Sequence, residues 1–135
     1  QLMDNVMQRA QMRGQVRTLL GRLCRFHLWE PNQFGIHKPL SHDAALQEHG
    51  PGIKRAFTYK ALNRLIQGSA ADMTKKAMIQ LHKEGITPHI QVHDELDISV
   101  DNNADKIKDI MESAVELEVP NKVDYESGPN WGTIK

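Results

Sequence analysis

The spacing of apolar residues predicts three helices along the chain. Apolar side chains and arginines at every fourth position predict a helix over residues 1–20, with Gly21 as its end. The longest helical pattern covers residues 54–84. A shorter one follows Asp101 and runs to about residue 117. The chain therefore has enough helix to cover one side of a small sheet.

A strand pattern lies between the last two predicted helices. Residues 87–100 alternate between apolar and polar side chains, which is typical of strands. Pairing Val92 with Leu96 keeps the apolar residues on one face, because directly paired residues share a face. This pairing leaves His93-Asp94-Glu95 as a three-residue loop. The sequence therefore predicts a hairpin with an acidic tip.

The remaining segments are predicted to be short strands and loops. Residues 23–29 and 122–125 read as strands, and 30–52 as a long loop in which Ser41 caps a short helix. The predicted fold class is α+β, with a small antiparallel sheet and its acidic hairpin packed against long helices.

Composition narrows the class of protein. The chain has 135 residues, 39% of them apolar, which suits one compact domain. Its single cysteine, Cys24, excludes an internal disulfide and a cysteine-only metal cluster, and suits a reducing compartment. No apolar run approaches the roughly 20 residues of a membrane helix, so no membrane partner is predicted. The start at Gln1, without a methionine, suggests a fragment or a processed chain.

Charge is divided unevenly along the chain. Residues 1–64 contain ten Lys/Arg and four Asp/Glu, a net charge of +6, whereas residues 65–135 contain seven and thirteen, a net charge of −6. A basic half suits a phosphate-bearing partner and an acidic half suits divalent cations.

The acidic tip is a candidate metal site. Tight hairpin loops commonly need a residue with positive φ, and without glycine a histidine or an acid must adopt that conformation. The adjacent carboxylates of Asp94 and Glu95 repel each other unless a cation lies beside them. Mg²⁺ prefers carboxylate and phosphate oxygens. The tip is therefore predicted to bind Mg²⁺.

A second candidate site lies on the long predicted helix. Tyr59, Asn63 and Gln67 are four residues apart and share a helix face. Amide groups on one face can donate to the acceptors that every base pair presents in the minor groove. The small residues 68–71 that follow predict close helix packing. The face is therefore a candidate nucleic-acid contact.

Both candidate sites belong to longer motifs that resemble family A DNA polymerases, the bacterial DNA polymerase I type and its phage relatives. Gln91–Leu96 resembles motif C of that family, and Tyr59–Asp72 resembles the helix that precedes motif C. Thr18–Arg22 resembles the segment after the fingers helix, and Gly128–Trp131 resembles the usual C-terminal end. These motifs cover nearly the whole chain in the family's order and spacing.

The resemblance implies roles for individual residues. Asp94 matches the metal-ligand aspartate, Glu95 its acidic partner, and His93 the residue beside the primer end. Asn63 and Gln67 match the amides that contact the minor groove at the primer terminus. Three further residues are expected on the DNA: Arg22 and Arg64 as phosphate contacts, on their charge alone, and Tyr59, which stands where some relatives have arginine.

The resemblance also implies partners and a location. The partners are primer–template DNA, a deoxynucleoside triphosphate and an upstream polymerase portion, because the motif A aspartate and the fingers helix have no counterpart here. Residues 1–52 correspond to an edge of the fingers with a connecting loop, and 53–135 to the C-terminal palm. Activity is expected in the cytoplasm of a bacterium or a phage-infected cell, while the 135 residues alone are expected to be inactive.

Two alternative functions stay open at this stage. The chain could be a non-catalytic DNA-binding subunit of a split polymerase, with a vestigial hairpin. A phage-type RNA polymerase palm is the other alternative, although Glu95 after Asp94 and the run Gln67–Asp72 argue against it.

Overall fold

The computed structural model describes residues 1–134 and has the predicted α+β class, with four α-helices and three two-stranded antiparallel sheets in the described chain. The chain forms two compact units, the first covering Gln1–Ser69 and the second starting at Ala70. The long helix α3 (Ala61–Lys83) contributes residues to both. None of the described helices is long and apolar enough to cross a membrane.

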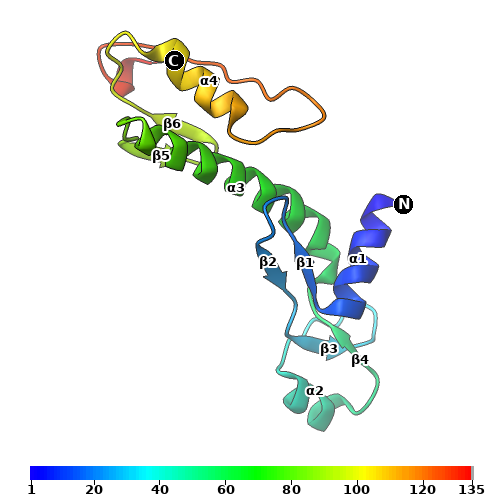
Figure 1. The fold of residues 1–135 in the computed structure, drawn as a ribbon. Helices are drawn as coiled ribbons and strands as arrows, with labels where there is room; N and C mark the ends of the chain where they lie inside the picture. The colour runs from blue at the N-terminus through cyan, green and yellow to red at the C-terminus, as the bar shows by residue number, and fades with distance from the viewer. Residues whose placement is uncertain (135) are drawn as a thin grey trace. The chain divides into compact units, whose positions relative to one another are not determined.

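The first unit contains two α-helices, two two-stranded sheets and the start of a third helix, and one of the α-helices lies in the connection between the strands of the second sheet (Figure 1). β1 pairs antiparallel with β2, placing Val16 opposite Cys24, and β3 pairs with β4, placing Glu30 opposite Lys54. The elements before α3 are α1 (Leu2–Arg13), β1 (Gln15–Arg17), β2 (Leu23–Arg25), β3 (Trp29–Pro31), α2 (His42–His49), β4 (Ile53–Arg55) and the 3₁₀ turn η1 (Thr58–Lys60).

The predicted helix over residues 1–20 is wrong beyond Arg13. Gly14 adopts a left-handed conformation with φ 68°, and its N–H donates to the carbonyl of Ala10 at 2.9 Å. Glycine commonly ends a helix in this conformation, because it has no Cβ that would be strained there. Residues 15–17 then pair with residues 23–25, so their backbone groups bond to a strand rather than within a helix.

The predicted helix over residues 54–84 starts later than its apolar pattern suggests. Ile53–Arg55 forms β4, because its backbone pairs with β3. Phe57 then has φ 62°, which is uncommon for a residue with a side chain, and redirects the chain into η1. The α-helix itself begins at Ala61.

The core of the first unit is built from small side chains and one aromatic ring. Val6, Ala10, Val16, Phe26 and Ala61 are buried together. The predicted close packing at residue 68 is confirmed: a Cβ on Gly68 would lie 2.9 Å from Thr18 Cγ2. Beside it, the Leu19 N–H donates to Ser69 Oγ at 2.9 Å. The start of α3 therefore packs directly on the β1–β2 turn.

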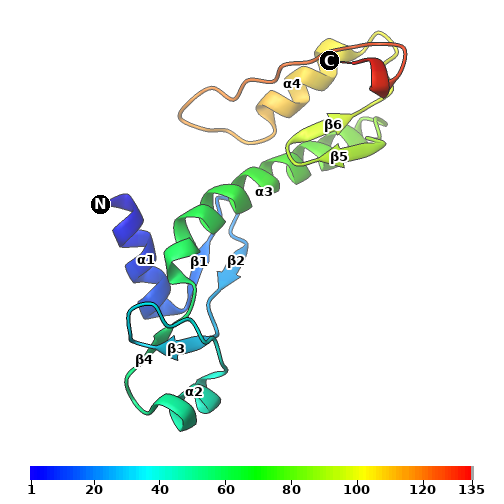
Figure 2. The same cartoon turned by 180° about the vertical axis from the view of Figure 1, so that it is seen from behind.

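The second unit contains the end of α3, a hairpin and one further helix. Its elements are β5 (Ile90–Val92), β6 (Glu95–Asp97), α4 (Ala104–Ser113) and the 3₁₀ turn η2 (Trp131–Thr133). Figure 2 shows the hairpin beside the C-terminal part of α3. The core holds Leu81, Ile86 and Ile107, with Leu96 and Ile98 packed against it. The hairpin therefore packs against helices, as predicted.

The segment after α4 differs from the prediction of a strand at residues 122–125. α4 ends at Ser113, and the segment between it and η2 is irregular. The Val123 N–H donates to Glu112 Oε1 at 2.9 Å, so a side chain of α4 satisfies a group that a strand would pair with another strand.

An ion pair links the end of α3 to α4. Lys106 Nζ lies 2.8 Å from Glu84 Oε2. The hydrogen bond and the positive charge of Lys106 lower the pKa of the exposed Glu84 carboxyl below its usual range. The contribution of this ion pair to folding stability is present above the usual carboxyl pKa and is lost as the pH falls through the lowered pKa of Glu84. Because the pair is exposed, it adds little to folding.

Changing Gly68 to alanine tests the packing of α3 on the β1–β2 turn. The added Cβ overlaps Thr18 and approaches Arg22 Nη2 to 3.3 Å, so we expect the free energy of unfolding to fall by about 1–3 kcal/mol. Chemical denaturation of the chain measures the loss. Gly52→Ala is the control, because a Cβ there meets nothing within 4 Å. Equal effects of the two substitutions would contradict the packing.

Candidate functional site

The acidic tip of the β5–β6 hairpin is a two-residue turn. Val92 pairs with Glu95 and Gln91 with Leu96, so His93 and Asp94 form the loop. His93 has φ 53°, as expected for a turn without glycine, and the Gln91 amide donates to its carbonyl at 3.1 Å. Positive φ at His93 but not at Asp94 is the pattern of a type II′ turn rather than a type I′ turn.

The predicted register, with Val92 opposite Leu96, is therefore wrong by one residue. The shift places the apolar side chains of β5 and β6 on opposite faces of the hairpin. Leu96 faces the core, while Ile90 and Val92 are 42% and 41% exposed. β5 buries neither face, so burial does not fix its register.

The tip presents its polar side chains to solvent. His93, Asp94 and Glu95 are all exposed and consecutive. The described residues contain no group of three or more His, Cys, Asp or Glu arranged around a common cation position. Two adjacent carboxylates with free access match the oxygen ligands that Mg²⁺ prefers, and Mg²⁺ usually completes its shell with water and substrate phosphate. The donor chemistry of the tip therefore fits a divalent cation.

The predicted amide face lies in the first unit, at the start of α3. Asn63 and Gln67 are exposed and one helical turn apart. Tyr59 lies in the 3₁₀ turn η1 rather than in the α-helix, so the helical spacing does not extend the face to it. Its ring centroid is 6.2 Å from that of His37, and Lys60 Nζ is 5.6 Å from it. The two amides alone share an α-helical face.

The two arginines predicted to contact DNA also contact the protein. Arg22 Nη2 donates to the Gly68 carbonyl at 2.8 Å. The Arg64 guanidinium lies 5.0 Å from the ring centroid of Phe26, a cation–π distance. Both side chains keep exposed surface, so their positive charge remains accessible.

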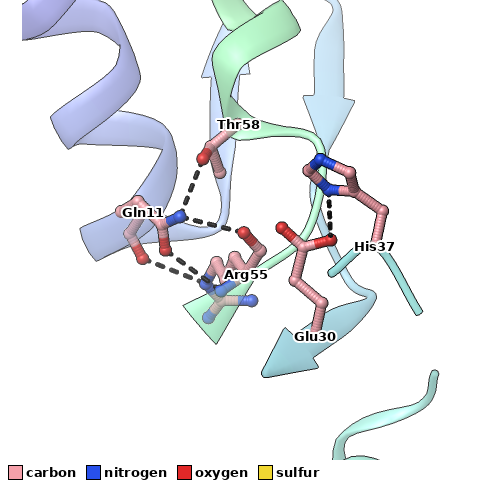
Figure 3. A network of polar contacts seen from close by, with 5 residues as sticks. All are labelled: Gln11, Glu30, His37, Arg55 and Thr58. Atoms are coloured by element: carbon pink, nitrogen blue, oxygen red, sulfur yellow. Dashed lines mark hydrogen bonds and ion pairs between the residues drawn. The ribbon is translucent and has the colours of Figure 1, made fainter. Parts of the chain in front are cut away.

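A polar network that the sequence analysis did not identify surrounds Arg55 (Figure 3). Gln11 Nε2 donates to the Arg55 carbonyl at 2.9 Å and to Thr58 Oγ1 at 2.7 Å. Nearby, His37 Nδ1 lies 3.3 Å from Glu30 Oε2, and the Glu30 side chain is 3% exposed. The sequence signal for this region was Gly14, because a glycine that follows a basic residue commonly marks the end of a helix, and the network forms at the end of α1.

Comparison with known proteins gives consistent matches over the chain. The family described as "DNA polymerase family A" matches residues 1–133. The DNA-directed DNA polymerase of Pseudomonas phage M6 is 40% identical over 126 residues, which cover 92% of this chain and 16% of the relative. DNA polymerase I of Geobacillus stearothermophilus is 36% identical over 147 residues, covering 100% and 15%. The chain thus spans about a sixth of the length of these relatives.

A solved structure gives a similar result. The structure described as "POL domain of Pol1 from M. smegmatis complex with DNA primer-template and dNTP" is 28% identical with a TM-score of 0.56. The match covers 87% of this chain and 20% of that one.

Substitution of His93 tests the geometry of the acidic turn. Glycine adopts positive φ without a steric penalty, so His93→Gly should raise the free energy of unfolding by up to about 1 kcal/mol. His93→Val should lower it by about 1–2 kcal/mol, because a β-branched residue is disfavoured there. Chemical denaturation compares the two variants. A valine variant as stable as the glycine variant would contradict the positive φ of residue 93 in this turn.

Proposed function

The chain belongs to DNA polymerase family A, and we propose that it is the C-terminal part of a DNA-directed DNA polymerase that adds deoxynucleotides to a primer 3′ end. The observation that carries this proposal is the exposed run His93-Asp94-Glu95 at the tip of the β5–β6 hairpin, inside a family match over residues 1–133. The acidic turn is a feature that nucleotidyl transfer uses directly, since such reactions depend on cations held by carboxylates.

The acidic turn is the chain's contribution to the metal site. Asp94 supplies carboxylate oxygens to Mg²⁺, Glu95 adds negative charge beside it, and His93 lies next to the primer end. A pair of Mg²⁺ ions held with the help of this turn would supply activation of the 3′ oxygen and stabilisation of the leaving pyrophosphate. A two-residue turn fixes the backbone of Asp94 between paired strands, which limits the positions that its carboxylate can take.

The first unit contacts the DNA. Asn63 and Gln67 donate hydrogen bonds to minor-groove acceptors near the primer terminus, a contact that does not distinguish A·T from T·A. Arg22 and Arg64 add positive charge for the phosphates, and Tyr59 lies beside this face. The similarity to the M. smegmatis structure, whose description includes a DNA primer-template and dNTP, supports DNA as a partner.

The catalytic centre is completed by an upstream polymerase portion. We assign the motif A aspartate and the fingers helix to that portion, because the curated relatives are about six times longer than their matched segments. The deoxynucleoside triphosphate binds against it, and the complete enzyme acts in the cytoplasm of a bacterium or a phage-infected cell.

Removing the charge of Asp94 separates catalysis from binding. In the complete polymerase, Asp94→Asn should lower single-turnover extension by several orders of magnitude, because each 1.36 kcal/mol of lost stabilisation is about tenfold in rate. DNA affinity should hold or rise slightly, because a negative charge near the phosphates is removed. Extension and DNA affinity are measured in parallel.

Neighbouring carboxylates provide matched controls. Glu95→Gln should reduce extension less, and Asp97→Asn, on β6 beyond the turn, should reduce it least. Near-normal extension by Asp94→Asn would contradict the metal assignment. If the chain binds duplex DNA but no primer is extended, whether the chain is assayed alone or with the upstream portion, the non-catalytic subunit is the favoured interpretation.

Truncation of either amide tests the minor-groove contact. Asn63→Ala and Gln67→Ala should each lower the preference for matched over mismatched primer ends about fivefold, the equivalent of one hydrogen bond of about 1 kcal/mol. The control is Gln47→Ala, which removes an exposed amide from α2. Unchanged extension of both matched and mismatched ends would show that the amides are merely solvated.

A further inference from the structure

The guanidinium of Arg55 packs against the protein at the end of α1. Its Nε donates to the Gln11 carbonyl at 3.1 Å and its Nη1 to the Phe26 carbonyl at 2.9 Å. Its Cζ lies 4.5 Å from the ring centroid of Trp29. A Cβ on Gly14 would come within 2.7 Å of the same Cζ. The position of this side chain is therefore fixed from several sides.

Gln11 completes the arrangement with its amide. The Arg55 backbone N–H donates to Gln11 Oε1 at 3.1 Å, while Gln11 Nε2 donates to the Arg55 carbonyl and to Thr58 Oγ1. Figure 3 shows these contacts converging from α1, β4 and η1. We name Gln11, Arg55 and Thr58 the Gln11–Arg55 clamp. The clamp bonds the chain on both sides of Phe57.

The residue between the clamped positions is conformationally strained. Phe57 has φ 62°, and such a conformation persists in a residue with a side chain where the surroundings enforce it. Thr58 is 5% exposed, and Ala61, three residues later, is fully buried against α1. The conformation of Phe57 therefore sets the direction in which η1 and α3 begin.

We propose that Gln11 and Arg55 are positioning residues for the amide face, which they act on through Phe57 and the start of α3. This inference rests on the proposed function, because it assumes that Asn63 and Gln67 read the primer terminus. Arg55 then serves fidelity through the protein interior, with no contact to DNA.

The alternative role for Arg55 is an ordinary phosphate contact. The two roles make opposite demands on the side chain. A phosphate contact needs positive charge, which lysine also supplies, whereas the clamp needs a planar group that donates to two carbonyls and stacks on Trp29. Arg55→Lys therefore separates them.

The experiment uses the complete polymerase that carries this chain, assayed well below its melting temperature. The variants are Arg55→Lys, Gln11→Ala, Asn63→Ala and the double variant Arg55→Lys/Asn63→Ala. Arg25→Lys is the control, because Arg25 is an exposed arginine of the first unit. Matched and mismatched primer extension are measured, together with the dependence of DNA affinity on salt for Arg55→Gln.

We expect Arg55→Lys and Gln11→Ala to lower the matched-to-mismatched extension ratio several-fold, and Arg25→Lys to leave it unchanged. The double variant should lose less discrimination than the sum of the two single losses, because both changes disturb the Asn63 contact. The salt dependence of DNA affinity should be the same for Arg55→Gln and the parent enzyme.

Three results would overturn the proposed positioning role of Gln11 and Arg55. The first is normal discrimination in Arg55→Lys when Asn63→Ala is defective, and the second is fully additive losses in the double variant. The third is a salt dependence of DNA affinity that is weaker by about one phosphate contact in Arg55→Gln. Normal discrimination in Asn63→Ala would contradict the proposed function instead.

Discussion

A cation placed at the C-terminal end of a helix organises the first unit of this chain. The last carbonyls of α1 have no partner within the helix, and Arg55 supplies one to Gln11. A positive charge is also favourable at that end of the helix dipole. The apolar core around it is made largely of Ala10, Ala61 and other modest side chains. Small side chains bury little area, so polar contacts are needed to orient α1, β4 and the start of α3.

Strand pairing explains why the helical pattern failed at two places in the first unit. Apolar residues on either side of Gly14 suggested one helix, although residues 15–17 pair with a strand. Likewise, Ile53–Arg55 matched a helical period but pairs with Trp29–Pro31 across the intervening excursion. In both cases the backbone pairs with another strand, and a helical period of apolar residues cannot detect that pairing.

The backbone conformation of the acidic turn was more predictable than the elements around it, whereas the roles of the site residues stay predictions. The motif residues at 63, 67, 94 and 95 are exposed, as binding groups must be, and the turn gives His93 a positive φ, as the lack of glycine demands. The register could not be predicted, because the argument required all apolar residues on one buried face. That requirement fails for β5, since Ile90 and Val92 are exposed in this chain.

Under the proposed function, the basic half of the chain uses different residues for DNA affinity and for recognition of the primer end. Four of its seven arginines bond to carbonyls or lie on an aromatic ring: Arg17 to Gly21, Arg22 to Gly68, Arg55 to Gln11 and Phe26, and Arg64 on Phe26. Bonds to uncharged carbonyls leave the positive charge in place, so the field that attracts phosphates persists. The positions of these four side chains, however, are set by their contacts within the protein. Under the proposed function, reading the primer end then depends on Asn63 and Gln67, which carry no charge and whose positions depend on how α3 is held.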